Sequence, residues 1–360
     1  LAVFVLGVFC FIQGWMGGGD VKLLPVVALW AGPAEIVATF FVIGLAGGVL
    51  ALVSTPGFDT NLFVNGISTR EYSALRDSLD VPLFNRAVQG SYPPGSTVKP
   101  FMAMAGLESG LVTPETTVAD PGWYKLPGDS RRYRDWILRI RGTGHAPQVD
   151  MNMAIAESCD VYFYDLARRL TIDRMHEYLS PYGFGDRTGV DTTNERSGVL
   201  PSTAWKRSAM AQAWYPGETI SAGIGQGYWL STPMQLAAAT GVLASRGERH
   251  TPRLLKAVNG KPVAVPSQPR LAADSDHWDA VFDGMRAVVH GERGTAKYLA
   301  DDIAYEMAGK TGTAQVIGIA QNAVYKEEEV AERHRHHGLF IAFAPLDAPT
   351  IAVAVIVENG

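Results

Sequence analysis

Charged residues are almost absent from the start of this chain. There are none from Leu1 to Gly19 and none from Ile36 to Val53. Uncharged, mostly apolar stretches of about 18 residues or more are typical of membrane-spanning helices. The alternatives are a pair of buried core helices and a signal peptide, but the basic start and small-residue cleavage site of a signal peptide are missing. We therefore expect an α-helical membrane segment at the beginning of the chain.

The sequence after Val53 has a different pattern of charged and apolar residues. Ser54–Gly57 is a turn signal, and charges, turns and short apolar runs alternate beyond it, as in a water-exposed folded domain. With 47% hydrophobic and 19% charged residues, the chain is not of the disordered class. The net charge of −5 gives no basic excess, so we expect no nucleic-acid partner.

The periodicity of this second part predicts an α+β protein, with an antiparallel sheet flanked by helices. The two last strands look like an antiparallel pair. A helix or a strand is consistent with Val49–Val53. The expected helices are 96–109, 151–170 and one that starts at Thr232 and Pro233, and the expected strands are 49–55, 305–310, 338–344 and 351–358.

A Ser-x-x-Lys motif, Ser96 to Lys99, follows the sequence YPPG. Residues three apart share one face of a helix, so a neutral Lys99 amine can take the proton of the Ser96 hydroxyl. At the start of a helix, Ser96 also lies beside unpaired N–H groups, which are suited to form an oxyanion hole. The alternative is a capping serine with a solvated lysine.

Two further polar motifs follow along the chain. Ser158–Asp160 can present a hydroxyl and a carboxylate to one cleft, and Lys310–Thr313 reads KTGT after an apolar strand. A lysine and a hydroxyl on a strand can bind a carboxylate, and the glycine lets another backbone approach closely. Taken singly, each motif is equally consistent with an ordinary polar turn or strand end.

The order of the three motifs resembles that of serine acyltransferases that act on D-alanyl peptides and are acylated by β-lactams. Short sequence segments around the motifs resemble the penicillin-binding protein 2 family, the class B peptidoglycan D,D-transpeptidases of rod elongation, from about residue 50 onward. These segments are Asn61–Val64 (NLFV), Tyr92–Pro100, Asp120–Trp123 (DPGW), Tyr133–Trp136 (YRDW), Gly223–Trp229 (GIGQGYW), Gly309–Val316 (GKTGTAQV) and Ala342–Pro345.

The resemblance implies a role for each motif residue. Ser96 would attack the penultimate D-alanyl carbonyl of a donor stem peptide, and Lys99 would be the general base. Ser158 would relay the proton to the leaving D-alanine. Asp160 stands where many relatives carry asparagine, as it does in the elongation subgroup.

The third motif would bind the donor peptide. Lys310 and Thr311 would hold its terminal carboxylate, Gly312 would let the peptide approach, and the N–H groups of Ser96 and Thr313 would form the oxyanion hole. An amine of a neighbouring stem peptide would then attack the acyl-enzyme and form a cross-link.

The resemblance also implies the setting of this activity. The expected fold is the penicillin-binding and serine-β-lactamase-like transpeptidase domain. The expected partners are peptidoglycan stem peptides ending in D-Ala-D-Ala, β-lactams, the membrane, and the elongation-machinery glycosyltransferase of the shape, elongation, division and sporulation family. The chain would lie in the bacterial inner membrane with its catalytic domain in the periplasm, and no cofactor is required for catalysis.

Four residues around the second motif suggest a metal site. Asp120, Asp135, His145 and Cys159 offer two carboxylates, an imidazole and a thiolate, an acceptable tetrahedral zinc set. Some members of the family carry such a site beside the cleft. We expect a structural zinc there, and the alternative is four unrelated residues with Cys159 a small buried side chain.

The first part of the chain resembles a different family. Gly17–Leu24 (GGGDVKLL) resembles the second aspartate motif of prepilin peptidases, but that chemistry needs two aspartates and none precedes Asp20. We therefore expect a chimera with two parts. Residues 1–48 would be a hydrophobic membrane-helix segment, and residues 49–360 a transpeptidase domain without the family's pedestal and truncated before its closing helix.

Three other functions stay open. A D,D-carboxypeptidase or β-lactamase would use water in place of the acceptor amine. A β-lactam sensor would be acylated without turnover. A prepilin peptidase is supported only by Gly17–Asp20.

Overall fold

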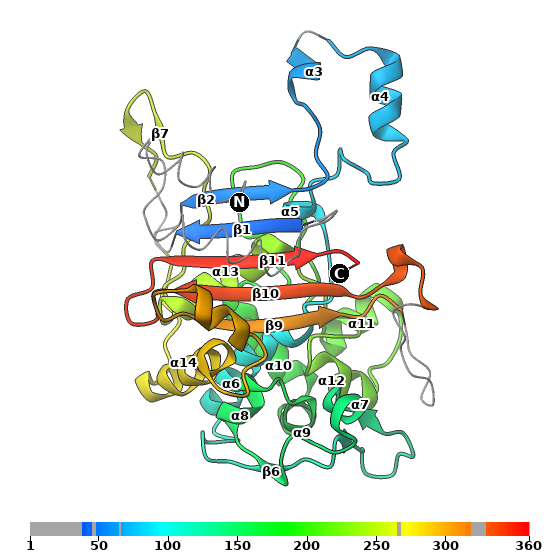
Figure 1. The fold of residues 1–360 in the computed structure, drawn as a ribbon, viewed down its shortest axis with the longest axis vertical. Helices are drawn as coiled ribbons and strands as arrows, with labels where there is room; N and C mark the ends of the chain where they lie inside the picture. Colours follow the sequence, from blue (N-terminus) through cyan, green and yellow to red (C-terminus); the bar gives the residue numbers. More distant parts are fainter. Residues whose placement is uncertain (1–37, 45–47, 65, 265–267, 318–328, 360) are drawn as a thin grey trace.

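A five-stranded antiparallel sheet forms the centre of the fold, with its strands in the order β2–β1–β11–β10–β9 (Figure 1). The structure is a computed structural model, and it describes residues 38–44, 48–64, 66–264, 268–317 and 329–359. The five strands are β1 (Ala38–Gly44), β2 (Val49–Ser54), β9 (Ala308–Ala314), β10 (His337–Ala344) and β11 (Ile351–Val357).

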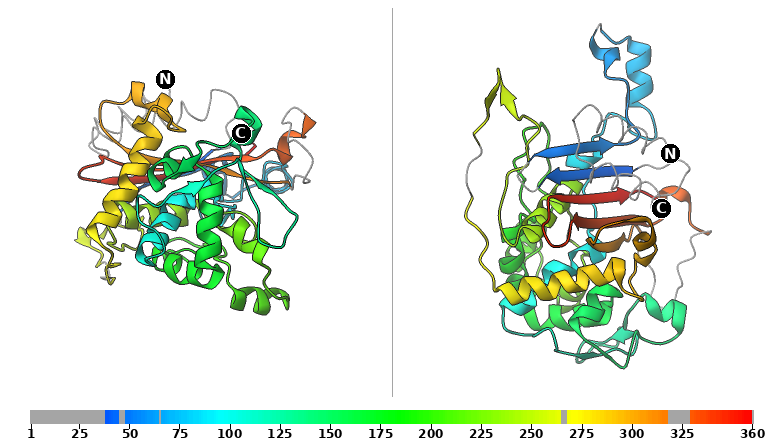
Figure 2. Two further views of the ribbon diagram at one scale, coloured as in Figure 1. Left: turned by 90° about the horizontal axis from the view of Figure 1, so that it is seen from below. Right: turned by 60° about the vertical axis from the view of Figure 1, so that its left-hand side comes forward.

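Most of the helical residues lie on one side of this sheet (Figure 2). The α-helices are α3 (Asn61–Val64), α4 (Thr69–Arg76), α5 (Arg86–Gln89), α6 (Lys99–Glu108), α7 (Ile137–Arg141), α8 (Met151–Ala156), α9 (Asp160–Leu170), α10 (Ile172–Leu179), α11 (Thr203–Met210), α12 (Pro216–Ala222), α13 (Pro233–Ala244) and α14 (Ser275–His290). The 3₁₀ turns are η1 (Gly95–Val98), η2 (Ser180–Tyr182), η3 (Lys297–Asp302) and η5 (Glu332–His334).

Three small two-stranded antiparallel pairs complete the described elements. They are β3 (Val118–Ala119) with β6 (Gln148–Val149), β4 (Trp123–Tyr124) with β5 (Tyr133–Arg134), and β7 (Ala257–Val258) with β8 (Lys261–Pro262). The α3–α4 segment projects beyond the edge strand β2 (Figure 1).

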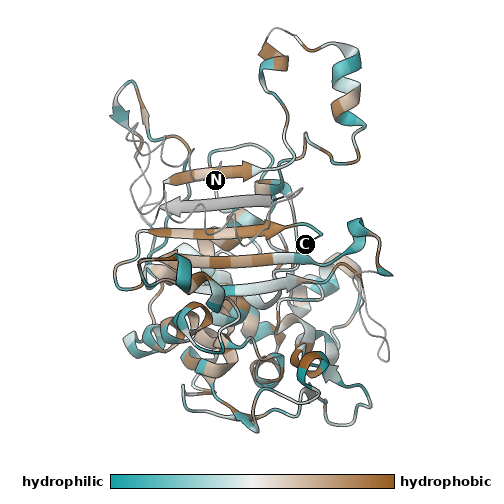
Figure 3. Ribbon diagram, in the orientation of Figure 1, coloured by the Kyte–Doolittle hydropathy of each residue, from teal (hydrophilic) through white to brown (hydrophobic). Residues whose placement is uncertain are grey.

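The late part of the sheet forms where the sequence predicts it. Every residue of β11 is buried, and β10 and β11 are largely hydrophobic along their length (Figure 3). They pair antiparallel from Gly338 opposite Val357 to Ala344 opposite Ile351, as expected. A strand buried on both faces needs such a continuous apolar, β-branched run.

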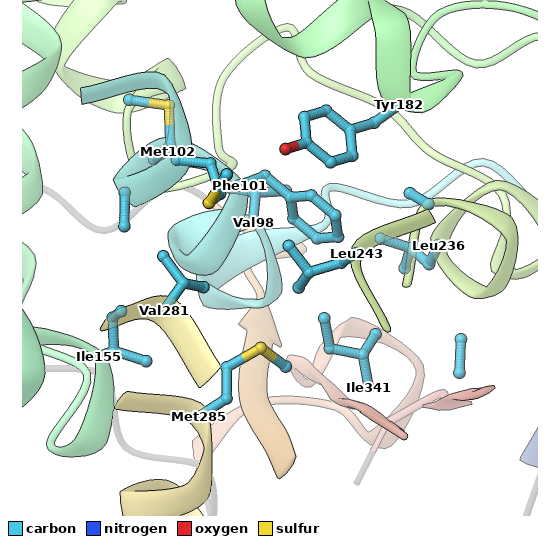
Figure 4. Packing of buried hydrophobic residues seen from close by; sticks show 14 of the residues in the cluster. Val98, Phe101, Met102, Ile155, Tyr182, Leu236, Leu243, Val281, Met285 and Ile341 are labelled. Carbon is cyan, nitrogen blue, oxygen red and sulfur yellow. The ribbon is translucent and has the colours of Figure 1, made fainter. Parts of the chain in front are cut away.

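One core joins the helices to the sheet directly behind the Ser-x-x-Lys segment. Val98 and Phe101 lie among Leu243 of α13, Met285 of α14 and Ile341 of β10 (Figure 4). Helix α13 begins as predicted, because Thr232 and Gln235 form a capping box and Pro233 occupies the first turn. These contacts hold the turn η1 (Gly95–Val98), which leads into α6, against β9 and β10.

The apolar stretch from Ile36 to Val53 is not a membrane helix in the part that the structure describes, so that expectation is wrong. Ala38–Gly44 and Val49–Ser54 are neighbouring strands, and β1 pairs with both β2 and β11. Sheet strands can have the same uncharged, apolar composition as a membrane span. The sheet therefore starts before the predicted domain boundary at residues 48 and 49.

Two other elements differ from the sequence prediction. The single helix expected over 151–170 is broken into α8 and α9 at Ser158, whose φ is +59°. The strand expected over 305–310 begins at Ala308 and continues to Ala314, so the KTGT motif lies inside β9.

No helix among the described residues is long and apolar enough to cross a membrane. The expected membrane helices before Ala38, with Gly17–Asp20, lie outside the described residues.

Candidate active site

Ser96 lies in the tight turn that starts helix α6. The turn η1 buries Gly95, Thr97 and Val98 and leaves Ser96 half-buried. Gly95 has a φ of +54°, and its N–H donates to the Gly225 carbonyl at 2.9 Å. A Cβ on Gly95 would lie 2.4 Å from the Thr313 carbonyl oxygen, so glycine is required where the turn meets β9. The turn therefore presents Ser96 where η1, strand β9 and the loop that contains Gly225 meet.

Lys99 lies one turn after Ser96, and its side chain is fully buried. Its ammonium donates to Asp160 Oδ1 at 2.7 Å, to the Ser158 carbonyl oxygen at 2.7 Å and to Ser158 Oγ at 3.1 Å. The backbone N–H of Lys99 donates to the Ser96 carbonyl. The structure thus brings the first and second sequence motifs into direct contact through one lysine.

The Ser158 turn is held from two sides. Asp135 Oδ2 accepts the N–H groups of Asp160 at 2.6 Å and Val161 at 3.2 Å, and so caps the first turn of α9. The Trp136 indole N–H donates to the Ser158 carbonyl at 3.1 Å. A non-glycine residue at positive φ is strained, and these contacts supply the surrounding support that such a conformation needs.

The third motif lies across from Ser96 on strand β9. A Cβ on Gly312 would lie 2.7 Å from Thr97 Cγ2, so strand β9 and the turn η1 pack in close contact. The Gln226 amide donates to the Thr313 carbonyl at 2.8 Å, which ties the Gly223–Trp229 loop to the same strand. The three motifs and the Gly223–Trp229 loop therefore meet around the turn that carries Ser96.

Lys310 is fully buried next to the other charged groups of the site. Burial lowers the pKa of Lys310 well below its usual range, and the positive charge of Lys99 lowers it further, while Asp160 acts in the opposite direction. Its ammonium donates to the Thr311 carbonyl at 2.9 Å. An anion placed beside a buried lysine strongly stabilises the charged form of its side chain.

The four residues expected to bind zinc also come together, directly behind the Ser158 turn. One ligand atom from each of Asp120, Asp135, His145 and Cys159 lies within 4.8 Å of the others, and all four residues are buried. His145 Nδ1 lies 2.9 Å from Asp120 Oδ2, and the Cys159 thiol lies 3.4 Å from the same oxygen. His145 Nε2 is buried and has no hydrogen-bond partner among the described residues.

The surroundings of this cluster shift the pKa values of its members in different directions. Burial raises the pKa of the Cys159 thiol well above its usual value, and the carboxylates of Asp135 and Asp120 add to the rise. Burial and the charge of Asp160 also raise the pKa of Asp135. Burial opposes the ionisation of Asp120, but the hydrogen bonds from His145 and Gly122 and the charge of His145 together lower its pKa. A dication would stabilise the ionised forms of Cys159 and Asp135 together.

Sequence patterns missed one segment that touches the site. Thr295 lies between α14 and η3, and its hydroxyl is 2.7 Å from the Thr311 hydroxyl. Arg293 forms an ion pair of 2.8 Å with the buried Glu157, next to Ser158. Neither residue belongs to a recognisable motif, and no signal in the sequence alone connects them to the site.

Comparison with known families gives two matches on this chain. The penicillin binding protein transpeptidase domain matches residues 40–360. The type IV leader peptidase family matches residues 1–52, which agrees with the predicted second resemblance at the start of the chain.

Individual proteins give the same result for the larger part. The chain is 47% identical over 319 residues to the peptidoglycan D,D-transpeptidase MrdA of Acinetobacter baumannii, covering 87% of this chain and 46% of that protein. This chain thus spans about half the length of that relative.

Two solved structures have the same fold. The crystal structure of Pseudomonas aeruginosa PBP2 in complex with WCK 5153 matches at 46% identity and a TM-score of 0.84, covering 95% of this chain and 73% of that one. PBP2 from Helicobacter pylori, in its complex with MreC, matches at 32% identity and a TM-score of 0.79, covering 95% and 58%. The predicted transpeptidase fold is therefore confirmed, and this chain belongs to the penicillin-binding protein transpeptidase family, in its penicillin-binding protein 2 branch.

Proposed function

We propose that this chain carries the catalytic domain of a peptidoglycan D,D-transpeptidase of cell elongation, which works through a serine acyl-enzyme. The contact of the buried Lys99 with Ser158 and Asp160, one helical turn from Ser96, carries the proposal. It provides a nucleophile, a base and a relay around one place, with the carboxylate-binding strand β9 opposite.

Acylation begins when the Ser96 hydroxyl attacks the penultimate D-alanyl carbonyl of a donor stem peptide. Lys99, in its neutral form, takes the hydroxyl proton, and the oxyanion is stabilised by the N–H groups of Ser96 and Thr313. The C–N bond to the terminal D-alanine then breaks, and Ser158 donates its proton to the departing amine while it takes up the proton that Lys99 received from Ser96. The contacts of Lys99 with Ser158 and Asp160 support this path for the proton.

Recognition of the donor depends on β9. Lys310 and Thr311 hold the terminal carboxylate, and Gly312 allows the peptide backbone to approach the strand. In the second half-reaction an amine of a neighbouring stem peptide attacks the Ser96 ester, its proton is taken up by the same base, and Ser96 recovers its hydroxyl proton. The result is a peptide cross-link and a free enzyme.

We further propose that Asp120, Asp135, His145 and Cys159 hold a structural zinc ion. The burial of all four groups and the unpartnered His145 Nε2 fit a metal with nitrogen, oxygen and sulfur ligands. A bound zinc would supply a fixed point behind the Ser158 turn and would take no part in the acyl transfer. Because Cys159 lies between Ser158 and Asp160, these ligands would hold the second motif in place.

The proposed setting follows from the relatives. β-Lactams would acylate Ser96, and the domain would act in the periplasm, anchored to the inner membrane. PBP2 of Helicobacter pylori is in complex with MreC in the structure named above, which supports a partner of the elongation machinery for this chain. A glycosyltransferase partner is proposed from the family resemblance alone.

A model donor peptide tests the reaction type. We expect the full chain, incubated with a tripeptide ending in D-Ala-D-Ala and a D-amino acid as acceptor, to release D-alanine and form the exchanged peptide, with neither product from Ser96→Ala. Hydrolysis without exchange would favour the carboxypeptidase or β-lactamase alternative. A stable penicillin adduct with no peptide turnover would favour the sensor.

A further inference from the structure

A short segment between α14 and η3 connects the second and third motifs. The Thr295 N–H donates to the Ala156 carbonyl at 3.2 Å, two residues before Ser158, and the Thr295 hydroxyl lies 2.7 Å from the Thr311 hydroxyl on β9. No sequence motif includes Thr295, and the roles proposed above do not use it.

The segment is built to hold Thr295 in place. A Cβ on Gly294 would lie 2.3 Å from the carbonyl oxygens of Ala287 and Val288, so the backbone packs directly on the end of α14. The Ala296 N–H donates to the Val288 carbonyl at 2.9 Å, and Ala296 is fully buried. Arg293 adds its ion pair with Glu157 and a 3.0 Å hydrogen bond to the His145 carbonyl.

The contact between the Thr295 and Thr311 hydroxyl groups limits which of the two can donate its proton. A hydroxyl has one proton to donate, although its oxygen can accept others. A carboxylate only accepts, so Thr311 can bind it only if the Thr311 proton is directed to the carboxylate. The 2.7 Å contact is then satisfied only if Thr295 is the donor and Thr311 Oγ1 the acceptor.

We propose that Thr295 is a positioning residue for carboxylate recognition, which donates its hydroxyl proton to Thr311 Oγ1 and thereby leaves the Thr311 proton for the ligand carboxylate. This inference rests on the proposed function, in which Thr311 binds that carboxylate. The fixed Thr295 backbone orients the Thr311 hydroxyl before the ligand arrives, so the ligand does not have to order it.

The test compares acylation rates of the full chain with benzylpenicillin and with its methyl ester, which lacks the carboxylate. We expect Thr295→Val to lower the second-order rate for the acid about tenfold, as for the loss of one oriented hydrogen bond, and to leave the rate for the ester unchanged. Thr295→Ser keeps the hydroxyl and should restore the rate for the acid. Thr350→Val, which removes a hydroxyl near the β10–β11 turn, is the matched control and should change neither rate.

Each other outcome overturns the inference. An equal loss for acid and ester would show a merely structural role for Thr295, as would a Thr295→Ser variant as slow as Thr295→Val. Melting temperatures of the variants identify a folding defect, in which case the Thr295→Ser rescue decides. Wild-type rates in Thr295→Val would refute the positioning role and leave the proposed function standing, whereas no Ser96 adduct on the wild-type chain would refute both.

Discussion

The Lys99 ammonium lies 2.7 Å from Asp160 Oδ1, and the lysine side chain has no exposed surface. Asp160 itself is nearly buried, and its position depends on the cap that Asp135 provides for α9. A charge buried this deeply is stabilised only by a partner and by hydrogen bonds. Asp160 of the second motif therefore supplies the counter-ion for Lys99 of the first motif.

A double-mutant cycle measures this coupling. Asp160→Asn leaves the buried ammonium without its counter-ion, and we expect it to lower the free energy of unfolding by about 3 kcal/mol. In the background of Lys99→Met the same substitution should cost less, with a coupling energy of about 1–3 kcal/mol. Urea unfolding of the four proteins gives these values. An equal cost of Asp160→Asn in both backgrounds would show that the two side chains are independent.

Two glycines at positive φ separate backbone strain from damage to the site. Gly95 (φ +54°) faces the Thr313 carbonyl, whereas Gly110 (φ +68°) has open space where its Cβ would be. Each change to alanine should cost about 1 kcal/mol in stability from the left-handed conformation. We expect only Gly95→Ala to displace the turn η1, with Ser96, from β9 as well, and to slow acylation by penicillin at least about tenfold. Similar acylation rates for the two variants would contradict the close packing described for Gly95.

The buried Lys310 gives the stability of the protein a defined pH dependence. Because burial lowers its pKa in the folded state, the folded protein binds fewer protons than the unfolded chain at pH values between the folded pKa and the ordinary lysine value of about 10.4. The free energy of unfolding should rise with pH across that window. Lys310→Met removes this rise, so the difference between wild type and variant should shift in favour of the wild type as the pH increases. A difference that is constant or falls would contradict the lowered pKa.

Metal analysis tests the zinc proposal. We expect about one zinc ion per purified chain, and a lower melting temperature after removal of the metal with a chelator. Cys159→Ser should lose the metal and the sensitivity to the chelator, and should also acylate more slowly, because the Ser158 turn is attached to Cys159. A chain that contains no zinc and melts at the same temperature with and without chelator would leave the four residues as a hydrogen-bonded cluster only.

The residues that meet at the candidate site could be predicted largely from the sequence, because acyl transfer needs particular residue types at short spacings. Ser96 and Lys99 are one helical turn apart, and the pairing of β10 with β11 follows from their apolar runs. The contacts of Thr295 could not be predicted, since they join Thr311 across a helix end that carries no motif.

The errors in the fold prediction have physical causes. Strand β1 lies between β2 and β11, so its apolar sequence resembles that of a membrane helix. The break at Ser158 is imposed by the site, because the helical pattern on both sides is continuous in the sequence. Strand β9 contains two glycines and a lysine, which are poor strand formers, and it is held by its register with β10.

Mass spectrometry of the full chain after incubation with a fluorescent penicillin shows whether Ser96 is acylated. We expect one covalent adduct per chain on the wild-type protein and none on Ser96→Ala, with both proteins folded by circular dichroism. An adduct that persists in Ser96→Ala, or a folded wild-type chain that forms no adduct, would contradict the assignment of this site as a serine acyltransferase.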